Sequence, residues 1–154
     1  MMKTVVFIVV FLSQEVFSKN LNVDVGCDLI GDHLKTLKKD LSKETCQQLC
    51  ASHRLCDGFV FVSGWNRCFL KKNIQRQVRV RMISGRKNQK GRENFDFSGK
   101  DIKQLSASTV KKCRNMCRHE VLCHGFTYIE GYSTCWIKRE GDLRQKVFYC
   151  GVKR

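Results

Sequence analysis

The sequence predicts an α+β protein made of two small disulfide-rich domains, each with one helix packed on β-strands. The first reason is a duplicated cysteine cassette, C-x3-C-x5-C-x11-C, and the second is that both copies pass from a helix-period segment into segments rich in aromatic and β-branched residues. The third is an N-terminus typical of exported proteins, whose regularly spaced cysteines form disulfides. The two copies, at a constant offset of 67, are Cys46, Cys50, Cys56 and Cys68, and Cys113, Cys117, Cys123 and Cys135.

Residues 1–18 have the pattern of a secretory signal peptide. A short basic start ending at Lys3 is followed by the apolar run Thr4–Leu12 and a more polar stretch that ends at the small residue Ser18. No segment approaches the about 20 apolar residues that a membrane-spanning helix requires. We therefore expect cleavage after about Ser18, no membrane span, and a secreted, extracellular protein.

Each repeat is expected to open with a strand and continue into a helix. In the first repeat, Val23–Leu29 is strand-like and Ser42 is placed to cap a helix. Residues at i, i+3 and i+4 share one face of a helix, so each helix directs two cysteines and one large apolar side chain inward. These inward residues are Cys46, Leu49 and Cys50 in the first repeat, and Cys113, Met116 and Cys117 in the second.

Three strand-like segments follow each helix. They are Phe59–Val62, Arg67–Lys71 and about Val78–Ile83 in the first repeat, and Phe126–Ile129, Thr134–Lys138 and about Lys146–Cys150 in the second. We expect the last segment to close the unit of its own repeat. The domains are then residues 19–86 and 95–154, with the polar and basic residues 87–94 as the linker between them.

Helix geometry suggests how the eight cassette cysteines pair. Two cysteines four residues apart on a regular helix share a face and cannot readily bridge each other, so each reaches a strand beneath the helix. The short links favour Cys50–Cys56 and Cys117–Cys123, which leaves Cys46–Cys68 and Cys113–Cys135. Each longer bridge closes some twenty residues and is worth roughly 3 kcal/mol by chain entropy.

Cys27 and Cys150 lie outside the cassettes, and each lacks a counterpart in the other repeat. Phe95 stands where a second Cys27 would be, and Ser84 stands where a second Cys150 would be. Two outcomes follow: a Cys27–Cys150 bridge within the chain, or two unpaired cysteines that could join chains into a homodimer. We favour the bridge, because free thiols are disfavoured in secreted proteins.

Positive charge is the strongest functional signal of the sequence. The formal net charge is +15, and both repeats carry it. A charge of this size indicates acidic partners, and arginine pairs well with sulfate. The candidate polyanion-binding residues are Lys71, Lys72, Arg76, Arg79, Arg81, Arg86, Lys87, Lys90, Arg92, Lys111, Arg114, Arg118, Lys138, Arg139 and Arg144.

Catalysis finds little support in the sequence. It contains no G-x-S-x-G, no H-E-x-x-H and no glycine-rich phosphate loop. The cassettes lack the spacings of a zinc site, and the four histidines occupy unrelated positions in the two repeats. We expect no enzymatic activity, no metal and no cofactor. Trp65 and Trp136 are expected to serve the core rather than a ligand, with Trp65 the more exposed.

The second repeat resembles a PAN/apple domain. The resemblance rests on F-x-G-x-D-I at Phe97–Ile102, the C-x3-C helix, C-x-G-F-T-Y and C-W-I-K. The first repeat is similar but looser, with Leu29 and His33 in place of the Phe and the Asp. The nearest similarity is to apple domains of contact-phase coagulation factors, with microneme-type apple proteins as the alternative. It implies a curved antiparallel sheet cradling one helix, and a module that binds proteins, glycosaminoglycans or sugars.

The sequence thus predicts a secreted, non-enzymatic protein that binds extracellular ligands, with sulfated, heparin-like glycosaminoglycan favoured. The first alternative is a protein-binding adaptor or decoy for a protease, a zymogen or a matrix protein. The second is a carbohydrate-binding lectin, which needs a concave polar and aromatic pocket. Nucleic acid would bind electrostatically, but export makes it a poor physiological partner.

Overall fold

The computed structural model describes residues 21–38 and 40–153, so the predicted signal peptide lies outside the described residues. The helices are α1 (Lys43–Ser52) and α2 (Val110–His119). The side chains of Ser42 and Thr109 cap them, accepting hydrogen bonds from the backbone N–H of Thr45 and Lys112 at 3.1 and 3.2 Å. The predicted helix start at Ser42 is confirmed.

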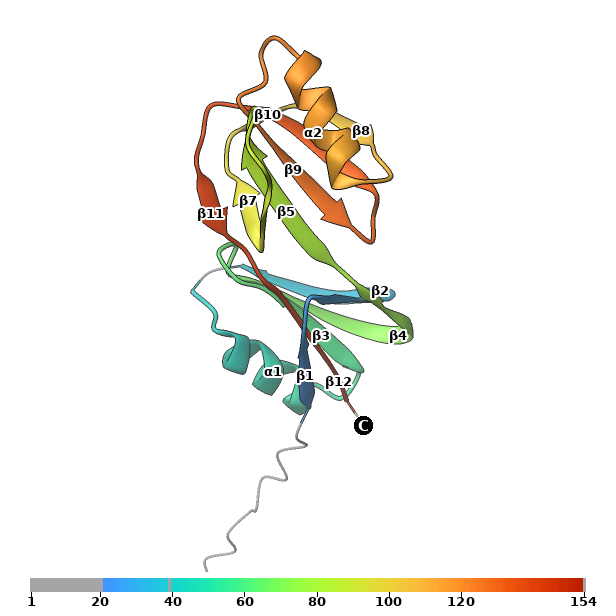
Figure 1. Ribbon diagram of the computed structural model, residues 1–154. Helices are drawn as coiled ribbons and strands as arrows, with labels where there is room; N and C mark the ends of the chain where they lie inside the picture. The colour runs from blue at the N-terminus through green and yellow to red at the C-terminus, as the bar shows by residue number, and fades with distance from the viewer. Residues whose placement is uncertain (1–20, 39, 154) are drawn as a thin grey trace, which may run out of the picture.

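The described strands form two five-stranded antiparallel sheets and one two-stranded ribbon (Figure 1). The first sheet has the order β1 (Asn22–Val25), β12 (Phe148–Val152), β3 (Gly58–Val62), β4 (Arg67–Arg79) and β2 (Cys27–Lys38). The second has the order β6 (Arg92–Glu93), β5 (Arg81–Arg86), β9 (Gly125–Glu130), β10 (Thr134–Arg139) and β8 (Lys100–Ser106). The ribbon pairs β7 (Phe95–Phe97) with β11 (Leu143–Gln145).

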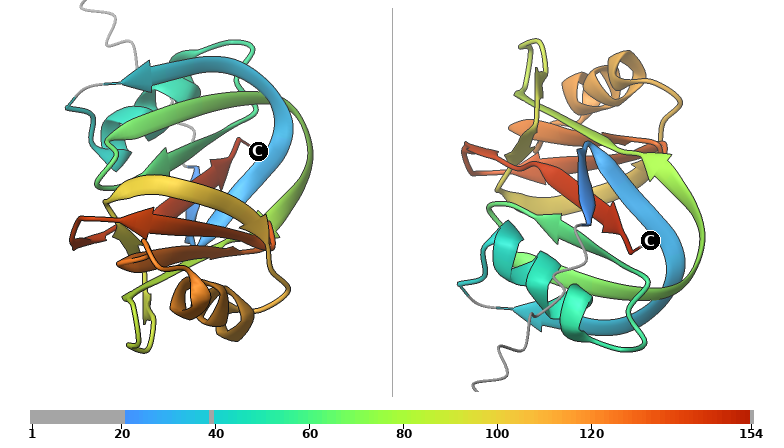
Figure 2. Two further views of the ribbon diagram at one scale, coloured as in Figure 1. Left: turned by 90° about the horizontal axis from the view of Figure 1, so that it is seen from above. Right: turned by 90° about the horizontal axis from the view of Figure 1, so that it is seen from below.

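The two sheets pack face to face, and each helix covers the outer face of one sheet, on the side away from the other sheet (Figure 2). Alternation along β3 shows this arrangement, because successive side chains of a strand point to opposite faces. Phe59 and Phe61 pack in the cluster that contains the cysteines of α1. Val60 and Val62 pack instead with Met82 and other residues of the second sheet. The prediction of two small disulfide-rich α+β domains is confirmed.

The last strands of the two repeats are exchanged between the sheets. β12 ends the second repeat but pairs with β3 and β1, whereas β5 ends the first repeat but pairs with β9. The expectation that each terminal strand closes its own unit is therefore wrong. Only Val80 separates β4 from β5. One residue cannot carry the chain from β4 across to the far edge of β3, so β5 continues into the other sheet.

The basic segment 87–94, expected to be a linker, forms the turn and return strand of a hairpin. Its strand β6 pairs with β5, with Ile83 opposite Glu93 and Ser84 opposite Arg92. The hairpin forms one edge of the second sheet: β6 is the outermost strand, and β5 lies between β6 and β9. This segment is therefore part of the second sheet and is not a linker between two domains.

The structure contains five disulfides and no free cysteine among the described residues. They are Cys46–Cys68, Cys50–Cys56, Cys113–Cys135, Cys117–Cys123 and Cys27–Cys150. The last one joins β2 to the exchanged strand β12. It therefore fastens the end of the second repeat into the sheet of the first.

The second sheet has a hydrogen-bond network where the first has the Cys27–Cys150 bridge. Ser84 on β5 faces Thr127 on β9, as Cys150 on β12 faces Val60 on β3. The Ser84 hydroxyl donates to Thr127 Oγ1 at 2.9 Å, and the Thr127 hydroxyl donates to Asp96 Oδ1 at 2.9 Å. All three residues are buried, so the network satisfies polar groups that would otherwise be costly to bury.

One polar contact between the two sheets predicts a pH effect. The Tyr132 hydroxyl, in the β9–β10 turn, donates to the carboxylate of Asp28 on β2. Burial and this carboxylate raise the pKa of Tyr132 above its usual value of about 10. Because the raised pKa favours the protonated form in the folded state, its stabilisation is complete below about pH 10 and is lost as the pH rises through the raised value.

We expect Tyr132 to ionise in a late step, above pH 10, in an ultraviolet absorbance titration of the folded protein. Tyr132→Phe should remove this late step. The late step persisting in Tyr132→Phe would contradict this assignment.

Candidate functional site

A groove of about 340 Å³ lies between the β5–β6 hairpin and the first turns of α2. We call it the hairpin groove. Four basic side chains line it, together with one acidic side chain, Glu93. The basic residues are Arg81 on β5, Lys90 in the hairpin turn, and Lys111 and Arg114 on α2. Lys111 and Arg114 are three residues apart and therefore neighbours on the helix surface.

The strand exchange creates this groove. α2 packs on β9 and β10 of the second sheet. β5 reaches the same sheet only because it continues from β4 and pairs with β9. Gly91 allows a close return of the hairpin, since a Cβ atom there would lie 2.6 Å from the side chain of Ile83. Lys90, which was predicted to lie in the linker, thereby lines the same groove as Lys111 of the second repeat.

Arg81 is held by acidic neighbours on the wall of the groove. Its Nε donates to Glu130 at 2.7 Å, and its terminal nitrogen donates to Glu93 at 2.9 Å. The hydrogen bond to Glu130 is the main reason that the pKa of Arg81 is raised. Arg81 is thus permanently charged and largely neutralised. Arg81 therefore fixes the position of the groove wall, and its neutralised charge contributes little to the attraction of an anionic ligand.

The other three cations of the groove have no carboxylate partner among the described residues. No ion pair there involves Lys90, Lys111 or Arg114. The Nε of Arg114 is also buried without a hydrogen-bond partner in this part of the chain. An unsatisfied buried donor costs about 1–3 kcal/mol. The N-terminal end of α2 adds a partial positive charge nearby.

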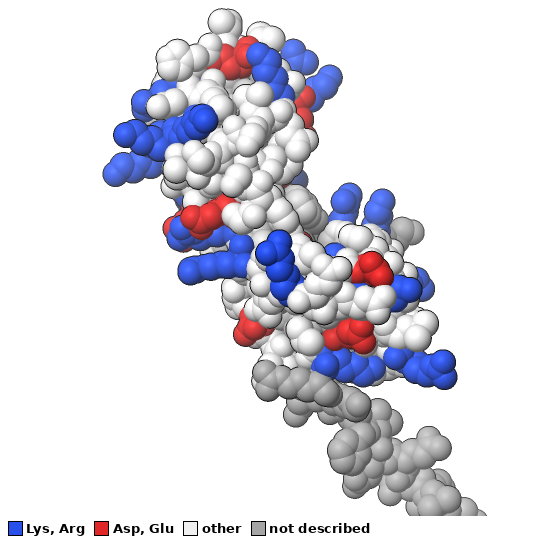
Figure 3. Space-filling model, turned by 90° about the vertical axis from the view of Figure 1, so that its right-hand side faces the viewer, with Lys and Arg blue, Asp and Glu red and all other residues white. Residues whose placement is uncertain are grey.

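The remaining predicted polyanion-binding residues lie outside the groove. Burial removes Lys71 and Lys138 from any surface cluster, because they are only 6 and 9 % exposed. Internal contacts hold three more: Arg86 pairs with Asp142, Lys87 donates to the carbonyl of Glu120, and Arg92 lies 4.0 Å from the Phe95 ring. The others are Lys72, Arg76, Arg79, Arg118, Arg139 and Arg144. Lys and Arg side chains are spread over both lobes on the face drawn in Figure 3.

Two helix-on-sheet units held by buried disulfides, with a charged surface groove, define a small binding module. The chain belongs to the PAN domain family, whose sequence profile matches residues 25–90 and again residues 91–149. PAN domains are non-catalytic modules that bind proteins or carbohydrates in extracellular proteins. The predicted resemblance to a tandem PAN/apple protein is therefore confirmed.

A putative receptor protein kinase of maize, ZmPK1, is 38 % identical over 45 residues. Those residues are 29 % of this chain and 6 % of the kinase, so the chain corresponds to only a small part of that protein. Among the residues that the structure describes, none of the helices is long and apolar enough to cross a membrane.

Proposed function

We propose that this is a secreted, non-enzymatic protein that binds sulfated glycosaminoglycan in the hairpin groove. The observation that carries the proposal is that Lys90, Lys111 and Arg114 line one groove without a carboxylate partner among the described residues. The planar guanidinium group pairs with sulfate through two parallel hydrogen bonds, and such charge-assisted bonds are stronger than neutral ones.

The charge of the whole chain supports the same ligand. A net charge of +15 attracts polyanions from a distance, and the groove then holds the sulfate groups at short range. Long-range attraction is screened beyond about 8 Å at physiological ionic strength, whereas a partly buried contact is screened much less. Binding in the groove should therefore persist at salt concentrations that abolish nonspecific attraction.

Heparin-affinity chromatography tests this proposal. The wild-type protein should elute only well above physiological salt. We expect the variant Lys90→Gln, Lys111→Gln, Arg114→Gln to bind heparin at least about tenfold more weakly, because it loses charge-assisted bonds.

The matched control removes the same charge elsewhere. Lys35, Arg76 and Arg144 are exposed and lie outside the groove, so changing all three to glutamine should shift elution much less. Equal shifts for the two triple variants would show that only net charge matters and would refute the groove. Elution of the wild-type protein at or below physiological salt would refute glycosaminoglycan binding altogether.

A protein ligand is the second candidate, and two equivalent exposed leucines favour it. Leu55 and Leu122 precede the third cysteine of each cassette and are 54 and 52 % exposed, with Val121 at 86 % beside Leu122. Val121 and Leu122 adjoin each other, and contiguous exposed apolar surface marks protein contacts, which single exposed side chains do not. Loss of a partner protein in Leu55→Ser, Leu122→Ser, with unchanged heparin elution, would favour this candidate.

A further inference from the structure

A cavity of about 260 Å³ opens between the two facing sheets and contains both tryptophans of the chain. We call it the inter-sheet cavity. Phe69 and Tyr132 add aromatic surface to Trp65 and Trp136, and its polar groups include Lys71 and His33. An adjoining cavity of about 190 Å³ shares both tryptophans. Trp65 is 38 % exposed, whereas Trp136 is partly buried against the core cluster between the sheets.

Lys71 is a buried cation without an acidic partner. It is 6 % exposed, and its ammonium group donates to His33 Nε2 at 3.4 Å. No ion pair among the described residues involves Lys71. A buried charge is costly unless it is paired, so this position favours an anion.

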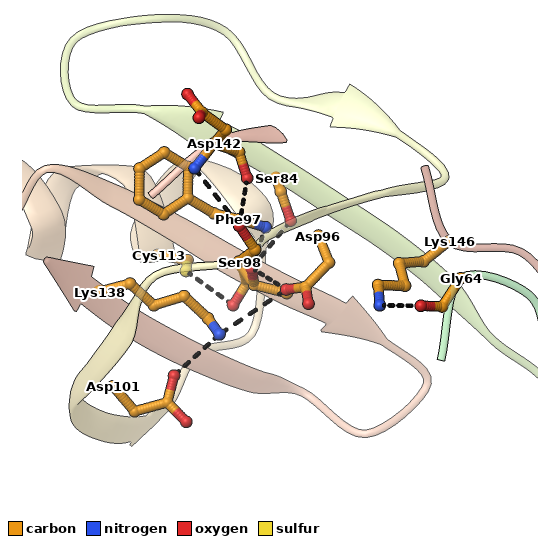
Figure 4. Close-up of polar contacts among 11 residues, drawn as sticks. Gly64, Ser84, Asp96, Phe97, Ser98, Asp101, Cys113, Lys138, Asp142 and Lys146 are labelled. Carbon is orange, nitrogen blue, oxygen red and sulfur yellow. Dashed lines mark hydrogen bonds and ion pairs between the residues drawn. The ribbon is translucent and has the colours of Figure 1, made fainter. Parts of the chain in front are cut away.

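In the second repeat, the lysine equivalent to Lys71 has two carboxylate partners. Lys138 lies 67 residues after Lys71, and its ammonium group lies 2.8 Å from Asp101 and 3.7 Å from Asp96 (Figure 4). The corresponding residues of the first repeat, at an offset of 68, are His33 and Asp28. His33 thus replaces one carboxylate with an imidazole.

Asp28, the second counterpart, is engaged elsewhere. Its carboxylate accepts hydrogen bonds from the Tyr132 hydroxyl and, at 2.7 Å, from the backbone N–H of Leu29. The lysine of the first repeat has therefore lost both of the carboxylates that neutralise its counterpart. Another buried lysine, Lys146, has a closer acceptor, since it donates to the carbonyl of Gly64 at 2.8 Å (Figure 4).

We propose that the inter-sheet cavity binds a small aromatic monocarboxylate. The ligand carboxylate accepts from the Lys71 ammonium group, in place of the missing acidic side chains, and its ring contacts Trp65 and Trp136. The cavity volume lies just below the usual range of about 300–1,000 Å³, which favours a ligand with a single ring. Asp28 also lines the cavity, so a second negative charge on the ligand would be repelled.

Tryptophan fluorescence reports directly on this cavity, because both tryptophans line it. Phenylacetate is the probe, and phenylacetamide is its neutral counterpart of nearly the same shape. Titration of the folded protein with phenylacetate should give a saturable change in fluorescence. Phenylacetamide should bind at least about tenfold more weakly, because it lacks the charge-assisted contact with Lys71.

Two variants remove the anion site in different ways. Lys71→Met deletes the ammonium group while keeping a side chain of similar length. His33→Asp rebuilds the neutralised arrangement seen at Lys138 and should retain the fold, as thermal unfolding will show. Both should lose at least about tenfold in phenylacetate affinity.

Arg76→Gln, an exposed cation on the same strand, is the control and should bind as the wild-type protein does. Unchanged phenylacetate affinity in folded His33→Asp would overturn the proposal. Equal binding of the acid and the amide, or no saturable signal with the wild-type protein, would also overturn it.

Discussion

A chain that ends at Gln145, and so lacks β12, is expected to lose the fold of the first sheet. Among the described strands of that sheet, β12 is the only neighbour of β1 and one of the two neighbours of β3. Its removal deletes the buried residues Val147 and Phe148, each worth about 1.5–3 kcal/mol. It also deletes Cys150 and the bridge to β2. Together these losses approach the total stability of about 5–15 kcal/mol that is usual for a protein domain.

Hydrogen exchange measures this effect strand by strand. In the shortened chain, the backbone amides of β1 and β3 should lose their protection, because β12 supplies hydrogen-bond partners to both. A chain ending at Lys153 is the control, since it keeps β12 and the hydrogen bonds of Lys153 to Asp57 and His53, and it should unfold like the chain ending at Arg154. Protected β3 amides in the chain ending at Gln145 would mean that β5 can return to its own repeat and replace β12.

The second large effect is expected from the double change Cys27→Ser, Cys150→Ser. This bridge spans a sequence separation of 123 residues, so chain entropy assigns it roughly 4 to 5 kcal/mol. The bridges Cys46–Cys68 and Cys113–Cys135 shorten the effective loop. Because the entropy depends on the logarithm of loop length, this shortening lowers the value only slightly. The free energy of unfolding in denaturant should fall by this amount.

The double change Cys117→Ser, Cys123→Ser is the matched control. It also replaces two buried half-cystines, but its bridge has a sequence separation of only 6 and is worth about 2 kcal/mol on the same account. The bridge to β12 should therefore cost about twice as much to remove. If the two double variants lose equal stability, the long-range bridge is not what retains the exchanged strand.

The local structure of each repeat could be predicted from the spacing of its residues. Ser42 caps α1, and the cysteines four residues apart on each helix are fully buried. These features depend on neighbours within one or two turns, which the sequence displays directly. The strand segments likewise follow from short runs such as Phe59–Val62.

The partner of each terminal strand could not be predicted in this way. Sequence similarity between the repeats indicates which strands are equivalent, but β5 and β12 can satisfy the same edge hydrogen bonds in either unit. The single residue between β4 and β5, Val80, decides the outcome through chain reach. Its effect appears only when the positions of both sheet edges are known.

The candidate ligand-binding residues show the same limit: the sequence identifies the basic residues, but only the packing shows which of them can meet a ligand. The list of basic residues came from composition, yet it joined Lys71 and Lys138, which are buried, with Lys90 and Lys111, which share a groove. Nothing in the local pattern separates them, because burial and proximity depend on how the two sheets pack.

The duplication, the helix-on-sheet class and the PAN family follow from the sequence alone, since they depend on local spacing and on repeated motifs. The exchange of the last strands, the groove between α2 and the β5–β6 hairpin, and the lack of acidic partners at Lys71 follow only from the three-dimensional packing. Those outcomes depend on contacts between residues far apart in the chain. Local spacing carries no information about them.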